Sequence, residues 1–129
     1  MNDLRVIQAD FADKKEEMEA IRVRWTQQLT ELVSAISEGF STFFNAMGFA
    51  GEVRLGHGQD PNDFHSYGID IFVKFREKVQ LQRLDPFQQS GGERSVSTAL
   101  YMLALQHLTK VPFRCVDEIN QGMDATNER

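Results

Sequence analysis

The sequence predicts an α/β fold in which one long N-terminal helix leads into a small lobe of strands and helices. Hydrophobic residues recur at helical spacing through residues 1–47, and residues 67–75 then alternate between apolar and polar side chains. A Ser-Gly-Gly turn beginning at Ser90 opens a second helical pattern, which is followed by a short apolar segment and two acids, Asp117 and Glu118. Helical periods on both sides of a period-two segment are typical of a mixed α/β domain.

The composition is that of a single soluble globular domain. The chain has 129 residues, of which 41% are hydrophobic and 26% charged, so it can form one core and is too apolar for wholesale disorder. A formal net charge of −5 argues against a broad basic surface that neutralises nucleic-acid phosphates. The sequence contains neither a secretory signal nor an apolar run that could cross a bilayer, so we expect a soluble intracellular protein with no membrane contact.

A heptad-like stripe predicts that residues 1–47 form one long helix. Polar residues interrupt the stripe at Lys14 and Gln28, and Gly39 is the only helix-weakening residue. At 1.5 Å per residue the helix would reach about 65 Å, much longer than a small domain needs. We therefore expect a coiled-coil arm that requires a partner strand and enters a lobe over residues 48–129; a helix in a compact bundle is the alternative. The stripe comprises Leu4, Ile7, Phe11, Met18, Ile21, Trp25, Leu32, Ile36, Phe40, Phe43 and Met47.

Three short strands are expected after the helix. Residues 52–55 form an apolar-polar segment that enters a Gly- and Asp-rich loop, and residues 67–75 alternate with period two. Residues 80–84 provide a further short strand. A β-hairpin or meander follows from this order.

The loop between the first two strands contains four possible metal ligands, but their spacing matches no compact ligand set. A solvated turn and a metal site therefore both remain open there. The four residues are His57, Asp60, Asp63 and His65.

The turn at Ser90, Gly91 and Gly92 precedes a helix expected over residues 93–110. Two glycines before a helix leave backbone N–H groups free to approach an anion, and the Ser90 hydroxyl and the helix dipole add to that attraction. A plain N-terminal turn is the alternative interpretation.

A short strand is expected at residues 113–116, and it delivers Asp117 and Glu118 at its C-terminal end. Nucleotide hydrolysis needs one carboxylate to hold Mg²⁺ and another to orient the attacking water, so adjacent acids suit the two tasks. An acidic loop after a core strand is the alternative. The single cysteine, Cys115, lies in this apolar strand and is expected to be buried in a reducing compartment, with a reactive thiol as the alternative.

No G-x-x-x-x-G-K-[ST] stretch occurs in the 129 residues, so these residues contain no phosphate-binding P-loop. The Ser90 turn, the two acids and a third turn at Gly122, Met123 and Asp124 follow one another in the order used by ATPases whose sites are completed by a second subunit. The chain is therefore predicted to be one half of an ATPase, with negligible ATP turnover on its own.

Together these motifs resemble the structural maintenance of chromosomes (SMC) family of ABC-type ATPases. Residues 90–95 are similar to the ABC signature, Asp117 and Glu118 to the Walker B acids, and Met123 with Asp124 to the D-loop. The similarity extends over the whole chain, including the coil that enters the lobe.

Within that family the chain most resembles the protein-five subfamily, over residues 88–98 and 117–124. Gln89 stands where most relatives have leucine, and Asn-Gln-Gly at residues 120–122 replaces the commoner acidic-small-small run. Both departures favour this subfamily over the cohesin and condensin members. The switch histidine expected beyond the D-loop is not visible.

The resemblance implies the C-terminal lobe of an ABC-type ATPase head of the P-loop NTPase superfamily, whose other lobe carries Walker A. ATP would lie between two heads, with Mg²⁺ held by Asp117 and with Glu118 as general base. Ser90, Gly91 and Gly92 would contact the γ-phosphate of the ATP bound by the partner head. The implied nucleotide-binding residues are Ser90, Gly91, Gly92, Glu93, Arg94 and Asp124.

The resemblance also implies partners and a cellular role. These are SMC protein six in a heterodimer, the chain's own N-terminal head lobe and coiled-coil strand, a kleisin subunit, and DNA bound by the whole complex. The implied role is chromosome maintenance and double-strand break repair by homologous recombination in the nucleus.

Two other functions stay open. A repair ATPase of the Rad-fifty type shares the coil-plus-lobe arrangement, and a zinc-hook cysteine pair, which these 129 residues lack, would favour it. A non-catalytic interaction module that acts through the coil and the exposed lobe edge is the second.

Overall fold

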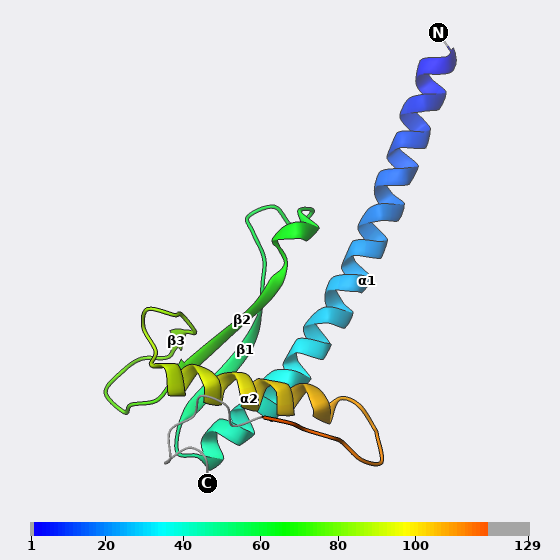
Figure 1. Ribbon diagram of the computed structural model, residues 1–129. Coiled ribbons are helices and arrows are strands. Elements are labelled where there is room, and N and C mark those ends of the chain that lie inside the picture. The colour runs from blue at the N-terminus through cyan, green and yellow to red at the C-terminus, as the bar shows by residue number, and fades with distance from the viewer. Residues whose placement is uncertain (1, 119–129) are drawn as a thin grey trace. The chain divides into compact units, whose positions relative to one another are not determined.

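The structure is a computed structural model that describes residues 2–118, with side chains from residue 6 onward (Figure 1). Contacts within the chain define two units, one up to Glu31 and one from Leu32 onward. The elements are α1 (Asn2–Ala46), β1 (Ala50–Gly56), the 3₁₀ turn η1 (Phe64–Ser66), β2 (Gly68–Lys74), β3 (Gln82–Arg83) and α2 (Gly91–His107). The long N-terminal helix and the mixture of helix and sheet are confirmed.

The first unit is the N-terminal part of α1, whose hydrophobic stripe is exposed. Phe11 is 71% exposed, and Ile7 and Met18 are similarly open to solvent. The polar side chains form local pairs, since Arg22 donates hydrogen bonds to the Glu19 carboxylate and holds the pKa of that group below its usual value. An exposed hydrophobic stripe of this kind is typical of a helix that packs on a partner helix. The coiled-coil interpretation stays a prediction.

The sheet of the second unit is antiparallel, in the order β1-β2-β3. Val53 pairs with Ile71, and Phe72 pairs with Arg83 on the following strand. The predicted meander is confirmed. Side chains alternate between the two faces of such a sheet, which places Val53 and Val73 on the buried face.

The core of the second unit lies between the C-terminal part of α1, the sheet and α2. Phe40 and Phe44 on α1 are fully buried, with ring centroids 4.5 Å apart, and Phe75 beyond β2 packs on Phe44 at 5.6 Å. Ala104 of α2 approaches α1 closely, because its Cβ would lie 3.6 Å from a Cβ built on Gly39. Small residues at this position allow the two helices to pack directly.

Two serines of α1 bind the free edge of β1. Ser41 Oγ donates to the Gly51 carbonyl at 2.7 Å, and Ser37 Oγ accepts from the Val53 N–H at 2.9 Å. Because the serines are four residues apart, they lie on the same face of the helix, one turn from each other. They satisfy backbone groups that a sheet edge would otherwise leave unpaired.

The loop between β1 and β2 is a folded turn. Ser66 Oγ accepts from the Gly58 N–H at 2.9 Å and donates to the Asp63 carbonyl at 2.7 Å, and the Tyr67 hydroxyl donates to the Pro61 carbonyl at 3.1 Å. Within residues 2–118, no three histidine, cysteine or acidic side chains are grouped so as to hold a metal ion. The solvated turn is therefore the better description of this loop.

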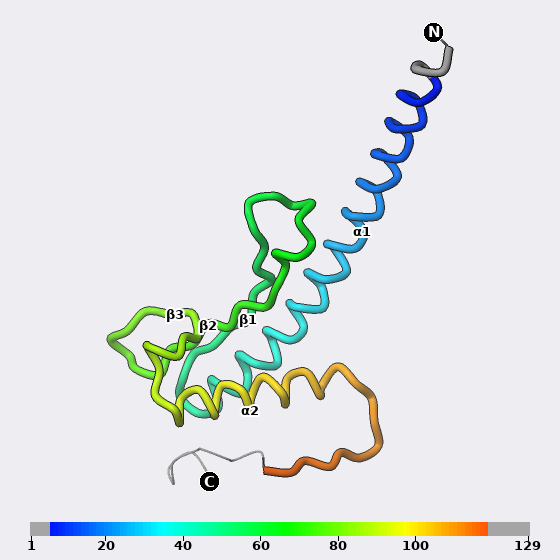
Figure 2. The backbone as a smooth tube through the Cα atoms, turned by 45° about the horizontal axis from the view of Figure 1, so that its top comes forward, coloured from blue at the N-terminus to red at the C-terminus, as the bar shows by residue number. Residues whose placement is uncertain are grey.

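Two expectations for residues 113–116 are wrong. These residues form no strand, and Cys115 is exposed rather than buried. After α2 the chain turns back and runs alongside that helix (Figure 2), where it finds no strand to pair with among residues 2–118. A single extended segment gains neither the ladder hydrogen bonds nor the covered face that a strand requires.

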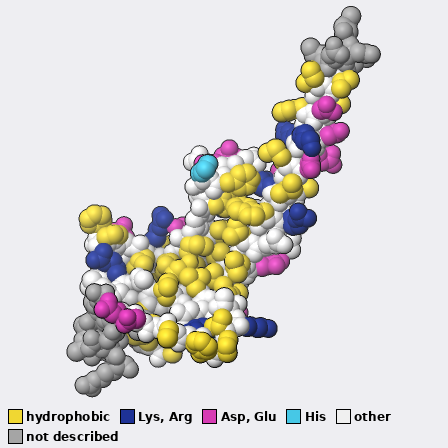
Figure 3. Space-filling view, turned by 45° about the vertical axis from the view of Figure 1, so that its right-hand side comes forward, with side chains coloured by type: hydrophobic (Ala, Val, Ile, Leu, Met, Phe, Trp, Pro, Cys, Tyr) yellow, Lys and Arg dark blue, Asp and Glu magenta, His cyan; other side chains and the backbone are white. Residues whose placement is uncertain are grey.

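No helix within residues 2–118 combines the length and the apolar character that a membrane span requires. Hydrophobic side chains nevertheless lie at the surface of both units (Figure 3).

We predict that Gly51→Ala destabilises the lobe, because the added Cβ would lie 2.7 Å from Phe40 Cε1 and 2.9 Å from Phe44 Cγ. Two fully buried rings cannot move aside easily, so the free energy of unfolding should fall by about 1–3 kcal/mol. Urea denaturation measures this loss. Gly68→Ala on β2 is the matched control, since a Cβ there meets nothing within 4 Å, and an equal loss in both variants would contradict the packing argument.

Candidate functional site

The first turn of α2 is held by a capping box. Ser90 Oγ accepts from the Glu93 N–H at 3.2 Å, and the Ser90 N–H donates to Glu93 Oε2 at 2.8 Å. This reciprocal pair satisfies two backbone donors at the start of a helix. The Ser90 hydroxyl proton donates to none of the described residues and is therefore available to an external acceptor.

A buried glutamine holds the turn that precedes Ser90. Among residues 6–118, Gln89 is one of two buried polar residues, and its Oε1 accepts from the Asp85 N–H at 2.6 Å. Asp85 Oδ1 in turn accepts from the Phe87 N–H at 2.7 Å, and the Phe87 side chain is 96% exposed. The backbone leading into Ser90 is thus fixed by hydrogen bonds within five residues.

Gly91 has open space where a side chain would be. A Cβ built on it meets nothing within 4 Å, and its φ angle lies outside the left-handed region. Neither packing nor backbone conformation within the described chain therefore requires glycine at this position. The N–H groups at the start of a helix lack intrahelical acceptors, so the open space exposes donors at the positive end of the helix dipole.

The carboxylate of Glu93 has a second partner outside α2. Arg76, in the loop after β2, donates from Nη2 to Glu93 Oε1 at 3.4 Å. The Glu93 side chain is 18% exposed and Arg76 is 74% exposed. The two carboxylate oxygens of Glu93 thus bind two different partners, the Ser90 backbone and the Arg76 guanidinium.

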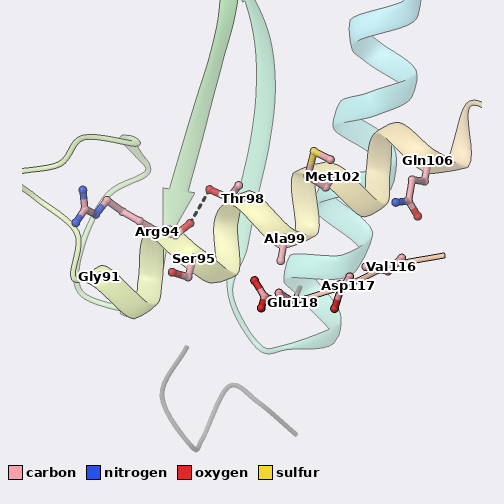
Figure 4. A pocket seen from close by; sticks show the side chains of 10 residues that line it. All are labelled: Gly91, Arg94, Ser95, Thr98, Ala99, Met102, Gln106, Val116, Asp117 and Glu118. Carbon is pink, nitrogen blue, oxygen red and sulfur yellow. Dashed lines mark hydrogen bonds between the residues drawn. The ribbon is translucent and has the colours of Figure 1, made fainter. Parts of the chain in front are cut away.

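A pocket of about 590 Å³ lies between α2 and the segment that carries the two acids (Figure 4). Of the residues predicted from the sequence, the pocket brings together Gly91, Arg94, Asp117 and Glu118, whereas Ser90, Gly92 and Glu93 do not line it. The Arg94 side chain extends away from the two acids (Figure 4). The remaining predicted site residue, Asp124, lies outside the described residues, as do Gly122 and Met123.

An arginine ties the segment of the two acids to α2. Arg114 donates from Nη2 to the Thr109 carbonyl at 2.8 Å and also to the Gln106 carbonyl, so it caps the C-terminal end of the helix. Asp117 and Glu118 follow and are exposed. Glu118 has a φ of 52°, in the left-handed region that residues other than glycine rarely adopt and that is over-represented at functional sites.

The acids fit magnesium chemistry. Exposed carboxylate oxygens are the hard ligands that Mg²⁺ prefers, and Mg²⁺ is commonly held by one or two carboxylates together with substrate phosphates and water. Asp117 and Glu118 supply such a pair, and residues 2–118 contain no all-protein cage that would indicate another metal.

Sequence reasoning missed several residues at this site. Ser95, Thr98 and Met102 line the pocket with Gly91 and follow it at steps of four, three and four, so a count along one helix face would have found them. Arg76 and the buried hydrogen bond of Gln89 left no such signal, because both depend on contacts between elements or on local loop geometry.

No protein-family model matches the chain. Curated relatives do match it. The chain is 53% identical over 115 residues to Structural maintenance of chromosomes protein 5 of Schizosaccharomyces pombe, which covers 89% of this chain and 10% of the relative. It is 52% identical over 120 residues to the protein of that name from Arabidopsis thaliana, covering 93% of this chain and 11% of the relative. It is 52% identical over 90 residues to Structural maintenance of chromosomes protein 6 of Takifugu rubripes, covering 70% and 8%.

Solved structures show the same fold. An Smc head domain with a coiled coil and joint from Pyrococcus yayanosii superposes with a TM-score of 0.67 at 25% identity, over 94% of this chain and 23% of that one. An Smc head bound to the C-terminal winged-helix domain of ScpA superposes with a TM-score of 0.57 at 29% identity, over 75% and 29%.

The lobe therefore has the fold of an SMC-type ATPase head segment. The chain belongs to the structural maintenance of chromosomes family, and its sequence is similar to the protein 5 members over most of its length. It spans about a tenth of the length of the curated relatives that it matches.

We predict that Gln89→Leu loosens the turn before Ser90. The substitution removes the acceptor of the Asp85 N–H, and losing one such hydrogen bond costs about 1 kcal/mol. Amide hydrogen exchange at Asp85 should therefore be about fivefold faster. Gln88→Leu, at an exposed neighbouring position, should leave that exchange unchanged, and equal protection in both variants would contradict the assigned role of Gln89.

Proposed function

We propose that the chain is the C-terminal half of the ATP-binding and ATP-hydrolysing head of a protein 5-type SMC subunit, and that its Ser90 turn completes the ATP site of a partner head. One observation carries this proposal: the open space at Gly91 beside a serine hydroxyl whose proton is unused by the described residues. An anion can approach those donors closely, and a helix N-terminus favours negative charge.

Ser90, Gly91 and Gly92 bind the γ-phosphate of the nucleotide held by the partner. The capping box occupies the Ser90 Oγ as an acceptor from the Glu93 N–H and so leaves the hydroxyl to donate toward phosphate. Arg94 and Asp124 complete the nucleotide-binding residues of the proposal. Donors fixed before the nucleotide arrives need no reorganisation when charge develops in the transition state.

Asp117 and Glu118 serve the nucleotide on the chain's own head. Asp117 holds magnesium, which when bound neutralises charge on the phosphates. Glu118 orients the attacking water and accepts its proton. In the proposed domain organisation, residues 1–47 are a coiled-coil helix and residues 48–129 are the head lobe.

The proposed partners are SMC protein 6, the chain's own N-terminal head lobe and coiled-coil strand, a kleisin subunit, and DNA bound through the whole complex. Similarity to a protein 6 supports the pairing, and the Smc head bound to ScpA supports a kleisin contact. Another solved structure, described under ATP-driven dimerization and DNA-stimulated activation of SMC ATPases, has the same fold. It superposes with a TM-score of 0.62 at 24% identity, over 78% of this chain and 58% of that one. The proposed setting is the chromosome in the nucleus, in repair of double-strand breaks by homologous recombination.

A non-catalytic interaction module is the second candidate. Exposed hydrophobic side chains on the segment after α2 favour it, since Phe113 is 80% exposed and Val111 and Val116 are about half exposed. The same side chains are expected to be covered when the other head lobe is present, so catalysis in the assembled head decides between the two candidates.

We predict that ATP hydrolysis appears only when this chain is combined with its N-terminal head lobe and a protein 6 head, and that Glu118→Gln lowers that rate at least about a hundredfold. The amide keeps the size of the side chain but removes its ability to accept a proton. Phosphate release under saturating ATP measures the rate. Turnover by the chain alone, or full turnover by the Glu118→Gln assembly, would refute the proposal, and an assembled complex without turnover would favour the interaction module.

We predict that Gly91→Ala leaves the stability of the lobe unchanged, because its Cβ has no neighbour within 4 Å, but abolishes nucleotide-dependent association with the partner head. A methyl group at the start of α2 would occupy the space into which the γ-phosphate comes. Thermal unfolding and ATP-dependent head association report the two effects separately. Normal association of this variant would remove the main support for phosphate binding at Gly91.

A further inference from the structure

We propose that Arg76 is a positioning residue for Ser90: it acts through Glu93, whose charge it compensates beside the phosphate-binding turn. The inference rests on the proposed function, because it assigns a supporting residue to the same site. It assigns Glu93 to holding the turn rather than to direct contact with nucleotide.

The hydrogen bonds form a chain that ends at the serine. Arg76 Nη2 donates to Glu93 Oε1 at 3.4 Å, Glu93 Oε2 accepts from the Ser90 N–H at 2.8 Å, and the Glu93 N–H donates to Ser90 Oγ at 3.2 Å. The two hydrogen bonds between Glu93 and Ser90 therefore help to hold the Ser90 hydroxyl in place.

The negative charge of the Glu93 carboxylate is also unfavourable for binding a phosphate at this turn. It lies beside the turn that is to receive a phosphate, and its side chain is only 18% exposed, so water screens its charge incompletely. Two negative groups close together repel, and a neighbouring cation reduces that repulsion. Arg76 is the cation that the structure places on Glu93.

The core fixes the position of the Arg76 backbone. Its neighbour Phe75 packs on Phe44 at 5.6 Å and on Phe49 at 5.0 Å, and the Arg76 carbonyl accepts from the Val79 N–H at 3.2 Å in the turn after β2. The backbone at Arg76 is therefore anchored to buried rings on one side and to a turn on the other. Its long side chain reaches Glu93 from that anchored position.

The Glu93→Gln variant separates the effect of the negative charge at residue 93 from the effect of the capping-box hydrogen bonds. The amide oxygen of Glu93→Gln can still accept from the Ser90 N–H, so the capping box is kept while the negative charge is lost. If Arg76 acts by compensating that charge, its removal should matter when residue 93 is glutamate and should matter little when it is glutamine.

The test is a double-mutant cycle in the assembled heads, with kcat and KM for ATP measured for Arg76→Ala, Glu93→Gln and the double variant. We expect Arg76→Ala to raise KM for ATP about fivefold with little change in kcat, as a loss of about 1 kcal/mol would, and to change KM less than twofold in the Glu93→Gln background. Arg76→Lys should restore most of the affinity. Arg83→Ala, which removes a similarly exposed arginine paired with Asp70, is the matched control and should have no effect.

Amide exchange at Ser90 in the same complexes separates this inference from the proposed function. Arg76→Ala should speed exchange of the Ser90 N–H, which Glu93 holds. Unchanged exchange, or an equal rise in KM in both backgrounds, would overturn the role of Arg76. Faster Ser90 exchange in a complex that hydrolyses no ATP would support the role of Arg76 and count against the proposed function alone.

Discussion

The lobe depends on the close packing of α1 against β1. Gly51 lets the buried rings of Phe40 and Phe44 approach the strand backbone, and Ser37 and Ser41 hydrogen-bond its outer edge from the same helix face. Apolar burial supplies the free energy of this contact, while the serine bonds set the position of the helix along the strand. Because β2 pairs with β1 along its whole length, the helix positions the entire sheet.

That packing reaches the candidate site through short connections. The rings of α1 contact Phe75, which directly precedes Arg76, and Arg76 binds Glu93 on the first turn of α2. The buried face of α2, with Val96, Ala99 and Ala104, completes the core from the other side. The Ser90 hydroxyl is thus supported by side chains of α1, of the loop after β2 and of α2, which is how a rigid scaffold positions groups on a turn.

Much of this arrangement could be predicted from the sequence, because it depends on local periods and turn residues. The long helix, the meander and the start of α2 follow from hydrophobic spacing and from Ser90 with its two glycines. Whether residues 113–116 form a strand could not be predicted in this way. A strand forms only when another strand pairs with it, and the apolar pattern of these residues does not show whether such a partner exists. Arg76 was invisible for a related reason: its bond to Glu93 joins residues 17 positions apart through the geometry of the core.

The hydrogen bonds from Ser37 and Ser41 to β1 also determine at which edge a further strand can join the sheet. The Gly51 carbonyl and the Val53 N–H on the edge of β1 are already bound by Ser41 and Ser37 of α1, so a further strand cannot use these two groups without displacing the helix. The opposite edge is β3, only Gln82–Arg83, and it has no such cover from a helix side chain among the described hydrogen bonds. Any additional strand, from this polypeptide or from another, would therefore join the sheet beside β3, on the side where the chain leads into the Ser90 turn.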